Sequence, residues 1–266
     1  MNRTSRYRRN TRPRDLFPVQ HPRQWRLIPP MVANGHVHMA VDRWLLRQHC
    51  RGLHPPTLRF YTWSPVAISL GYHQRQYPPR WDRLSWQGQF VERVRRPTGG
   101  RAVLHQGDLT YAIVSSGLTG SRRQVYEQLC QFLIEGWYSL GVPLTFGGAR
   151  QGDRANPSCF SAATTADLVT PRGVKLVGSA QRYEGGCVLQ HGSMRLRPDT
   201  DLFQTVFREA APLFELPLPL QTLSWEALQN RVVAALTTAA ATTLDISLKM
   251  TPMSADEINL ACSDLD

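Results

Sequence analysis

The chain has 266 residues, of which 42% are hydrophobic, and a formal net charge of +11. This length is typical of one large domain, or of one domain with a small appendage. No apolar stretch is long enough to span a membrane, and the basic N-terminus lacks the apolar segment of a secretory signal.

The excess positive charge lies in the first 28 residues, which hold eight Arg against one Asp. Their net charge is +7, which leaves +4 for the rest of the chain. We expect residues 1–28 to be a disordered, solvated tail, because it has no folded motif and no aromatic interleaving beyond Tyr7. Capture of an acidic protein or a nucleic acid is the less favoured alternative, as is a transit peptide. We therefore expect no nucleic-acid partner.

Hydrophobic periodicity predicts the elements of the first half of the chain. A helix is predicted from Val37 to Cys50, where apolar residues recur at the helical period before Pro55-Pro56. Gln74–Gln89 is predicted to be a polar loop region. Strands are predicted over Leu58–Trp63, Val66–Tyr72, Phe90–Arg95, Ala102–Leu104 and Leu109–Ser115.

The second half begins with the clearest helix, Arg122–Leu140, which has one apolar face and is followed by Gly141. Lys175–Met194 is predicted to be a hairpin with its turn at Glu184-Gly185-Gly186. The remaining predictions are a strand over Val142–Phe146, helices over Thr200–Phe207 and Ser224–Leu236, and a final helix that starts at the capping box Ser254–Glu257. Antiparallel strand pairs with separate helices indicate an α+β fold.

The five cysteines, at positions 50, 130, 159, 187 and 262, are odd in number and form no C-x-x-C pair. This pattern argues against a disulfide framework and a structural zinc site, and it favours a reducing, cytoplasmic compartment. Cys130 and Cys187 lie in apolar patterns that are typical of buried residues. Cys159 differs, because it lies in the loop Asn156–Phe160, from which a side chain can reach a substrate.

Two features point to acyl transfer. Gly99-Gly100, between Arg96 and Arg101, can bring backbone close to a polar or anionic ligand, although a plain turn between strands is the alternative. Lys175 comes later in the chain than Cys159, in the predicted hairpin, and the residues next to it in the sequence are apolar. A cation beside a thiol lowers the thiol pKa, and it can stabilise negative charge on a carbonyl oxygen. The chain has 29 Arg and only two Lys, which suggests that Lys175 is required as a compact ammonium, with chance as the simpler alternative.

Ordered blocks over roughly residues 30–200 resemble the biotin/lipoate A/B protein ligase superfamily, in particular its lipoate ligase and octanoyltransferase branch. The blocks are Val37–Asp42, Leu58–Pro65 with Ser69–Gln74, Arg95–Tyr111, the Cys159 loop, and the Lys175 hairpin with Gln190–Ser193. The resemblance implies one α+β catalytic domain over residues 29–250, with mixed, mostly antiparallel sheets flanked by helices. A short C-terminal helix over 251–266 would follow.

The Cys159 loop is similar to that of the cysteine-dependent octanoyltransferases. This resemblance implies that Cys159 carries an octanoyl thioester and that Lys175 activates it, without a cofactor or a metal. The implied donor is octanoyl-acyl carrier protein. The implied acceptor is a lysine of a lipoyl domain, such as that of glycine cleavage H protein or of a 2-oxoacid dehydrogenase subunit, and the enzyme would be a monomer.

The resemblance also assigns substrate binding to residues of the glycine turn and of the hairpin, with Ala102 and Leu104 as walls of a narrow tunnel. His105 and His191 would shape the pocket and transfer no proton. The residues are Arg96, Gly99, Gly100, Arg101, Ala102, Leu104, His105, Gly178, Ser179, Ala180, Gln181 and His191.

Two alternatives remain. An ATP-dependent lipoate–protein ligase would form an acyl-adenylate with ATP and Mg, and Cys159 would then be incidental. A non-catalytic protein that binds a lipoyl domain or an acyl carrier is the second. Ser161–Asp167 departs from the Ser-Pro-Ser-x-Tyr-Glu-like stretch of the family, which leaves the donor, the acceptor and the choice between octanoyl and lipoyl open.

Overall fold

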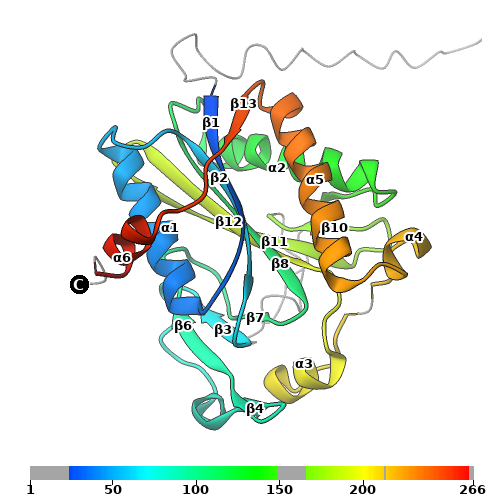
Figure 1. The fold of residues 1–266 in the computed structure, drawn as a ribbon. Coiled ribbons are helices and arrows are strands. Elements are labelled where there is room, and N and C mark those ends of the chain that lie inside the picture. Colours follow the sequence, from blue (N-terminus) through cyan, green and yellow to red (C-terminus); the bar gives the residue numbers. More distant parts are fainter. Residues whose placement is uncertain (1–23, 149–165, 213, 264–266) are drawn as a thin grey trace, which may run out of the picture.

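The computed structural model describes residues 24–148, 166–212 and 214–263. An eight-stranded mixed sheet in the order β13-β1-β2-β8-β12-β11-β10-β9 forms its centre (Figure 1). Neighbouring strands are antiparallel from β2 to β9, whereas β1 is parallel to both β2 and β13. The bounds are β1 (Gln24–Ala33), β2 (Thr57–Trp63), β8 (Asp108–Ser116), β9 (Thr145–Phe146), β10 (Leu168–Val169), β11 (Lys175–Glu184), β12 (Cys187–Arg195) and β13 (Ser247–Met250).

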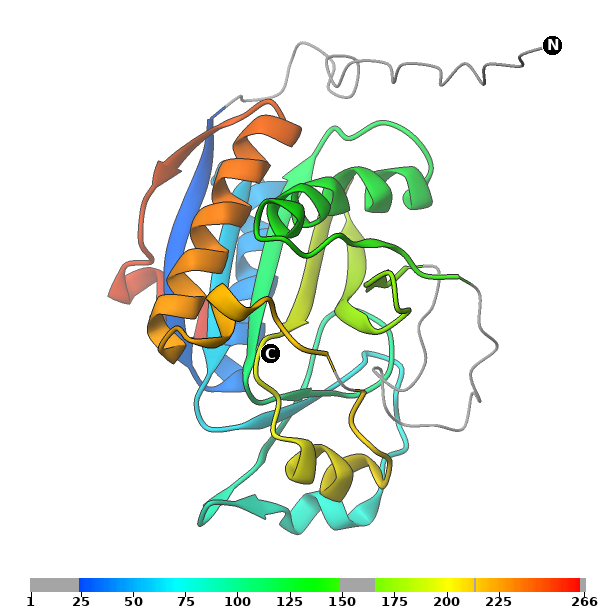
Figure 2. The same cartoon turned by 90° about the vertical axis from the view of Figure 1, so that its right-hand side faces the viewer.

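Helices cover both faces of this sheet (Figures 1 and 2). α2 (Arg122–Ser139) and α5 (Trp225–Thr243) pack against each other on one face, and α1 (Gly35–Cys50) packs with α6 (Ala255–Ser263) on the other. α2 begins at a capping box, in which the Ser121 hydroxyl accepts from the backbone N–H of Gln124. It ends before Gly141, whose φ of +79° favours glycine.

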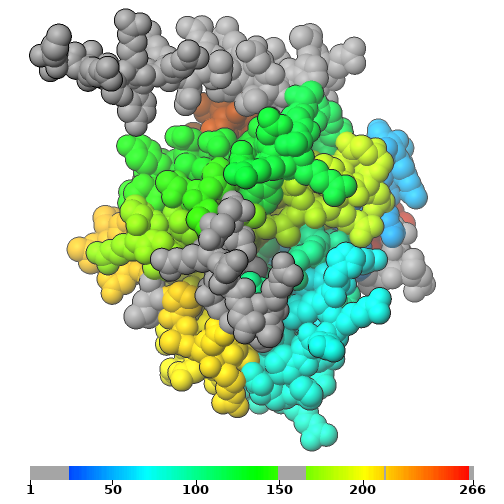
Figure 3. Space-filling view, turned by 180° about the vertical axis from the view of Figure 1, so that it is seen from behind, coloured from blue at the N-terminus to red at the C-terminus, as the bar shows by residue number. Residues whose placement is uncertain are grey.

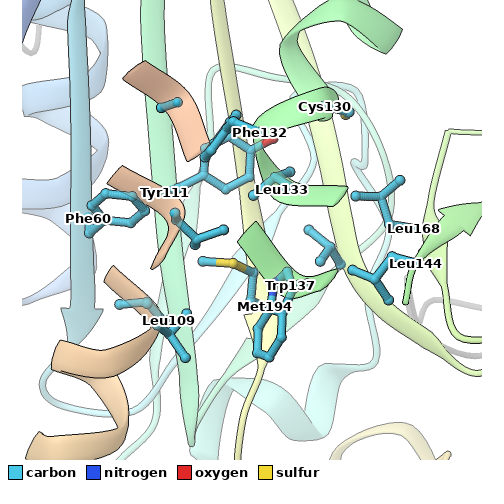
Figure 4. Packing of buried hydrophobic residues seen from close by; sticks show 14 of the residues in the cluster. Phe60, Leu109, Tyr111, Cys130, Phe132, Leu133, Trp137, Leu144, Leu168 and Met194 are labelled. Carbon is cyan, nitrogen blue, oxygen red and sulfur yellow. The ribbon is translucent and has the colours of Figure 1, made fainter. Parts of the chain in front are cut away.

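The larger hydrophobic core lies between the sheet and the α2–α5 pair (Figure 4). Phe132 and Trp137 of α2 are fully buried there, together with Phe60 of β2 and Tyr111 of β8. Burial of such side chains stabilises the fold by about 1.5–3 kcal/mol each. Gly136 is required between the helices, because a Cβ at this position would lie 2.6 Å from Cδ2 of Leu236.

A smaller three-stranded sheet lies beside the central one, with its own hydrophobic core. Ile68 and Trp81 pack there against Phe203 and Phe207 of α3 (Thr200–Phe207), which covers this sheet on its outer side. The strands are β6 (Glu92–Arg95), β3 (Ala67–Leu70) and β7 (Val103–His105), and nearby are the short hairpin β4 (Ser85–Trp86) and β5 (Gln89–Phe90) and the 3₁₀ turn η2 (Pro79–Arg83). The short helix α4 (Leu218–Gln221) lies instead beside α5, and its Leu220 belongs to the larger core (Figure 1).

The predicted α+β class, with mixed and mostly antiparallel sheets flanked by helices, is confirmed. Periodicity predicts the positions of five elements correctly. These are the hairpin strands β11 and β12 and the helices α1, α2 and α3. The capping box of α6 is also present, with Ser254 and Glu257 bonded in both directions. Within the described residues, no helix is long and apolar enough to cross a membrane.

The boundary expected at residue 28 is wrong. β1 begins at Gln24, and Trp25, Leu27 and Ile28 are buried in the two cores. The charge count led to this error, because it assigned Arg26 to the basic tail. In the structure Arg26 belongs to β1, and its guanidinium donates to the carboxylate of Glu257 in α6 at 2.6 Å. β13 was not predicted either, since its four residues are mostly exposed and carry no clear alternation. α5 extends to Thr243, seven residues beyond its predicted end.

Candidate active site

A partly open pocket lies between the central sheet and the small sheet. β8, β11 and β12 form its floor, while β3, β7 and the turn before β7 form its roof. On the face drawn in Figure 3, the yellow-green β11–β12 hairpin lies above the cyan segment that follows β3. The lining residues are Met39, Tyr61, Trp63, Ser69, Arg96, Gly99, Gly100, Val103, His105, Thr110, Gly178, Ser179, Ala180, His191, Gly192 and Ser193.

The turn in the roof is held together by Arg96. Its guanidinium donates to the carbonyl oxygens of Ser69 at 2.9 Å, Gly99 at 2.8 Å and Arg101 at 2.7 Å. Gly100 has a φ of +97°, and a Cβ there would lie 2.7 Å from Nη2 of Arg96. Arg96 is buried, and these three bonds fix the shape of the turn.

A buried carboxylate, Asp108, organises one wall of the pocket. His105 Nδ1 lies 2.8 Å from Oδ2 of Asp108, and His105 Nε2 lies 2.8 Å from the Ser69 hydroxyl. Ser193 and Thr110 donate to the same carboxylate oxygen, at 2.6 Å and 3.3 Å. Burial lowers the pKa of His105 despite the nearby Asp108, which favours a neutral imidazole at neutral pH.

A second buried carboxylate, Asp42 of α1, holds the other histidine of the pocket. His191 Nδ1 lies 2.8 Å from Oδ2 of Asp42, and His191 Nε2 lies 2.6 Å from the hydroxyl of Thr98. Arg59 and Tyr61 also bond this carboxylate, at 3.1 Å and 2.9 Å. Burial alone would raise the pKa of Asp42, but Arg59 and the bond from His191 outweigh it and lower the pKa below its usual value.

Lys175 stands at the start of β11, buried against the pocket wall. Only 3% of the residue is exposed, and its Nζ lies 2.7 Å from Oδ1 of Asp167. Its side chain passes over Gly178, where a Cβ would lie 2.7 Å from Cε and 3.0 Å from Nζ of Lys175. The absence of a side chain at Gly178 therefore lets the ammonium reach the pocket wall.

The comparisons with known proteins agree with this arrangement. The family model described as lipoyl protein ligase A/B catalytic domain matches residues 34–215. The chain belongs to this family. It is 41% identical over 184 residues to the octanoyltransferase LipM of Moorella thermoacetica, and this alignment covers 66% of this chain and 67% of the relative. It is 32% identical over 256 residues to LipM of Lysinibacillus sphaericus, which covers 88% and 92%. The resemblance stated from the sequence blocks is confirmed.

Solved structures with the same fold include protein Ta0514 of Thermoplasma acidophilum with bound lipoic acid, at a TM-score of 0.71 and 20% identity over 90% of this chain and 94% of that one. Lipoate-protein ligase A bound with ATP has a TM-score of 0.69 at 20% identity, over 90% and 93%. At these identities the likeness shows the fold.

In this lipoyl protein ligase A/B domain, eight of the twelve substrate-binding residues assigned from the sequence line the pocket. They come together from the roof turn and β7 on one side and from β11 and β12 on the other. They are Arg96, Gly99, Gly100, His105, Gly178, Ser179, Ala180 and His191.

The tunnel walls assigned to Ala102 and Leu104 require a correction. Side chains alternate along a strand, and β7 turns Val103 and His105 toward the pocket. Ala102 and Leu104 therefore face the core of the small sheet, where both are buried.

Arg101 and Gln181 do not line the pocket of the lipoyl protein ligase A/B domain either. Arg101 contributes a carbonyl oxygen that accepts from Arg96. The amide of Gln181 donates to Gln190 at 2.8 Å. Cys159 lies outside the described residues.

Sequence reasoning missed the two carboxylates under the pocket and the partner of Lys175. Asp42 and Asp108 lie inside the blocks that carry the family resemblance, so the sequence points to these positions. It does not reveal that they bond the pocket histidines His191 and His105. Asp167 is the last residue of the stretch that departs from the family pattern, and only the structure pairs it with Lys175. Among the described residues, no group of three or more His, Cys, Asp or Glu is placed to hold a metal ion.

Proposed function

We propose that this protein is an octanoyltransferase of lipoate biosynthesis, which moves octanoyl from acyl carrier protein to a lysine of a lipoyl domain. The observation that carries the proposal is the buried ammonium of Lys175 beside Gly178, which lines the pocket. The relatives named octanoyltransferase LipM support the acyl group and the reaction. The cysteine pattern favours a cytoplasmic location, and a monomer is the simplest assembly.

The pocket suits an apolar chain although many of its residues are polar. The hydroxyls of Ser193 and Thr110 donate to Asp108, and the His191 ring bonds Asp42 and Thr98. The donors of the wall thus bond one another and the two buried carboxylates. An acyl chain can pass them without leaving a buried donor unsatisfied.

The proposed chemistry has two steps. The Cys159 thiol loses its proton, the resulting thiolate attacks the carbonyl carbon of the octanoyl thioester, the bond to the carrier sulfur breaks, and that sulfur takes up one proton in place of the one that Cys159 released. The neutral amine of the acceptor lysine then attacks the acyl-enzyme, and the Cys159 sulfur leaves and takes a proton from the amine. The Lys175 ammonium favours the thiolate and stabilises the negative charge on the carbonyl oxygen in both steps.

The connectivity supports a nucleophile at position 159. The backbone N–H of Gly147 donates to the carbonyl of Asp167 at 2.8 Å, and Asp167 holds Lys175. Gly147 and Asp167, which are described residues on either side of position 159 in the chain, therefore meet beside Lys175.

The test is the intact mass of the enzyme after incubation with octanoyl-acyl carrier protein, with and without ATP. We expect an octanoyl adduct without ATP, mapped by peptide analysis to Cys159 and lost in Cys159→Ser. An adduct that forms only with ATP would support an acyl-adenylate ligase. No adduct, together with stable binding of the carrier, would support a non-catalytic binding protein.

A further inference from the structure

Two cysteines that the proposed chemistry does not use meet at the turn of the β11–β12 hairpin. Cys50 is the last residue of α1, and Cys187 is the first residue of β12. The strand register pairs Cys187 with Glu184, across the turn Gly185-Gly186. In Figure 1 the yellow-green turn end of this hairpin lies beside the C-terminal end of α1. Neither cysteine lines the pocket, so a role for them goes beyond the proposed function.

The side chains of the two cysteines point toward each other. Sγ of Cys50 donates to the carbonyl oxygen of Glu184 at 3.0 Å, and Glu184 is the residue opposite Cys187. A Cβ on Gly185 would lie 3.8 Å from both Cβ and Sγ of Cys50. Both side chains pack in the hydrophobic core under α1, and both are free thiols. The structure thus places two thiols from different elements in contact, which is what a disulfide requires.

The two thiols differ in how easily a molecule from solvent reaches them. Cys50 is half-buried, whereas only 4% of Cys187 is exposed. Burial raises the pKa of the Cys187 thiol to about 12, and its hydrogen bond with the Cys50 thiol adds to this shift. At neutral pH Cys187 is therefore un-ionised and shielded, so an oxidant reacts first with Cys50.

We propose that Cys50 and Cys187 form a modification site, at which a small disulfide such as oxidised glutathione converts the two thiols into a reversible disulfide between α1 and the hairpin. Cys50 loses its proton, and its thiolate attacks one sulfur of the oxidant, which breaks the S–S bond and releases one glutathione thiolate. Cys187 then loses its proton and attacks the Cys50 sulfur, and the second glutathione leaves. The protein gives up two electrons and two protons, and the oxidant becomes two thiols.

The disulfide joins two elements that already share a contact at the pocket. Asp42 of α1 bonds His191 of β12, and Cys50 and Cys187 lie on the same helix and the same strand. A cross-link between positions far apart in the sequence restricts the unfolded chain, so the oxidised protein should unfold at a higher urea concentration. In a reducing compartment such a bond is transient, unlike the bonds of a disulfide framework.

The experiment equilibrates the reduced, full-length protein with buffers of oxidised and reduced glutathione, and then blocks the remaining thiols with iodoacetamide. We expect peptide mapping to find the Cys50 and Cys187 peptides joined, with the loss of two hydrogen atoms, once oxidised glutathione is in excess. Dithiothreitol should separate them again. Glutathione on other cysteines maps to other peptides and does not enter the comparison.

Two single variants test the order of the two steps. Cys187→Ser should retain glutathione on Cys50, because no second thiol displaces it. Cys50→Ser should leave Cys187 unmodified, because the oxidant cannot reach a buried thiol. Cys262→Ser is the matched control, since Cys262 is also half-buried but lies on α6, and it should form the disulfide as the wild type does. Cys187→Ala is made in parallel in case the buried hydroxyl of Cys187→Ser prevents folding, as judged by circular dichroism.

Several outcomes would overturn the site. One is a folded wild type whose Cys50 and Cys187 peptides stay separate at every glutathione ratio, or whose Cys50 joins another cysteine. Another is loss of the disulfide in Cys262→Ser. Urea unfolding gives an independent measurement, in which the oxidised wild type should have a higher midpoint than the reduced one. An unchanged or lower midpoint would mean that the bond forms only in a distorted chain, and that the fold does not hold the two thiols ready for it.

Discussion

The ammonium of Lys175 is paired with the carboxylate of Asp167, with Nζ and Oδ1 2.7 Å apart and both side chains almost fully buried. This pair changes what Lys175 can do. Part of its charge is compensated before any substrate binds, and its position is set by Asp167 on one side and by the space over Gly178 on the other. We therefore expect Lys175 to act through placement as well as through charge.

Replacing Lys175 with Ala should reduce octanoyl transfer by about two orders of magnitude, a typical loss for one donor to a developing oxyanion. Alkylation of Cys159 at neutral pH should also slow, since the thiol pKa would return toward about 8.5. Lys175→Arg should be poor as well, because the wider guanidinium does not fit the space over Gly178. Lys249→Ala is the control, because Lys249 is the other lysine of the chain and is exposed on β13. Equal alkylation profiles in Lys175→Ala and wild type would leave Lys175 only a substrate-positioning role.

Asp167→Asn should separate charge from placement. Loss of the carboxylate leaves the Lys175 ammonium less compensated, so Cys159 should alkylate faster at neutral pH. Transfer should nevertheless fall, because the side chain that holds the ammonium at 2.7 Å has lost its charge. Rates of iodoacetamide alkylation and of single-turnover transfer measure the two effects. Asp82→Asn, in an exposed ion pair with Arg93, should change neither rate. A parallel rise or fall of both rates would show that the pair acts through charge alone.

Much of the fold could be predicted from local pattern. The helix from Arg122 and the hairpin from Lys175 carry strong periodicity, caps and glycines, and these local signals outweigh the tertiary context. β13 could not be predicted, because its pairing with β1 depends on residues more than 200 positions away. Such parallel edge strands leave little trace in sequence.

The site was predictable in part for the same reason. Gly99, Gly100 and Gly178 lie in a recognisable family pattern and do line the pocket. Trp63 could not be placed in the pocket lining, because its position depends on contacts with Thr110 and His105 from two other strands. Arg96 suggested a charge for the substrate, but its guanidinium donates to carbonyl oxygens that hold the turn, which no spacing rule reveals.

Truncation of the N-terminus should distinguish the basic tail from β1. Removal of residues 1–23 should leave folding and transfer intact, with at most a salt-sensitive loss of affinity for an acidic carrier. Removal of residues 1–28 should destabilise the protein strongly, because Trp25, Leu27 and Ile28 are buried and each contributes about 1.5–3 kcal/mol. Urea unfolding of both truncations checks this. Similar stabilities would mean that β1 is dispensable, and loss of transfer in the shorter truncation alone would assign a function to the tail.

Protein stability should depend on pH through His38 of α1. Its Nε2 lies 2.9 Å from the carbonyl oxygen of Thr62 and its Nδ1 lies 2.9 Å from Nη2 of Arg59. Burial, together with Arg59, lowers the pKa of His38 from 6.5 to about 3. Between these values the unfolded chain binds more protons than the folded one, so stability falls as the pH decreases through this window.

The slope of this loss is at most about 1.4 kcal/mol per pH unit for one such group, or about 2 kcal/mol between pH 6.5 and 5. Urea unfolding at pH 7 and pH 5 gives the free energy of unfolding at each pH. Between the two, the wild type should lose up to this much more of that free energy than His38→Gln, because Gln has no proton to gain. His36→Gln is the control, because His36 lies on the same helix with a side chain that is 65% exposed, and it should keep the wild-type slope. The buried His105 also lowers the stability as the pH falls, because its pKa is lowered too. It is present in all three proteins, so its effect cancels from the comparison. Equal losses in His38→Gln and wild type would mean that His38 gains its proton without unfolding, through an opening of α1 that this packing does not predict.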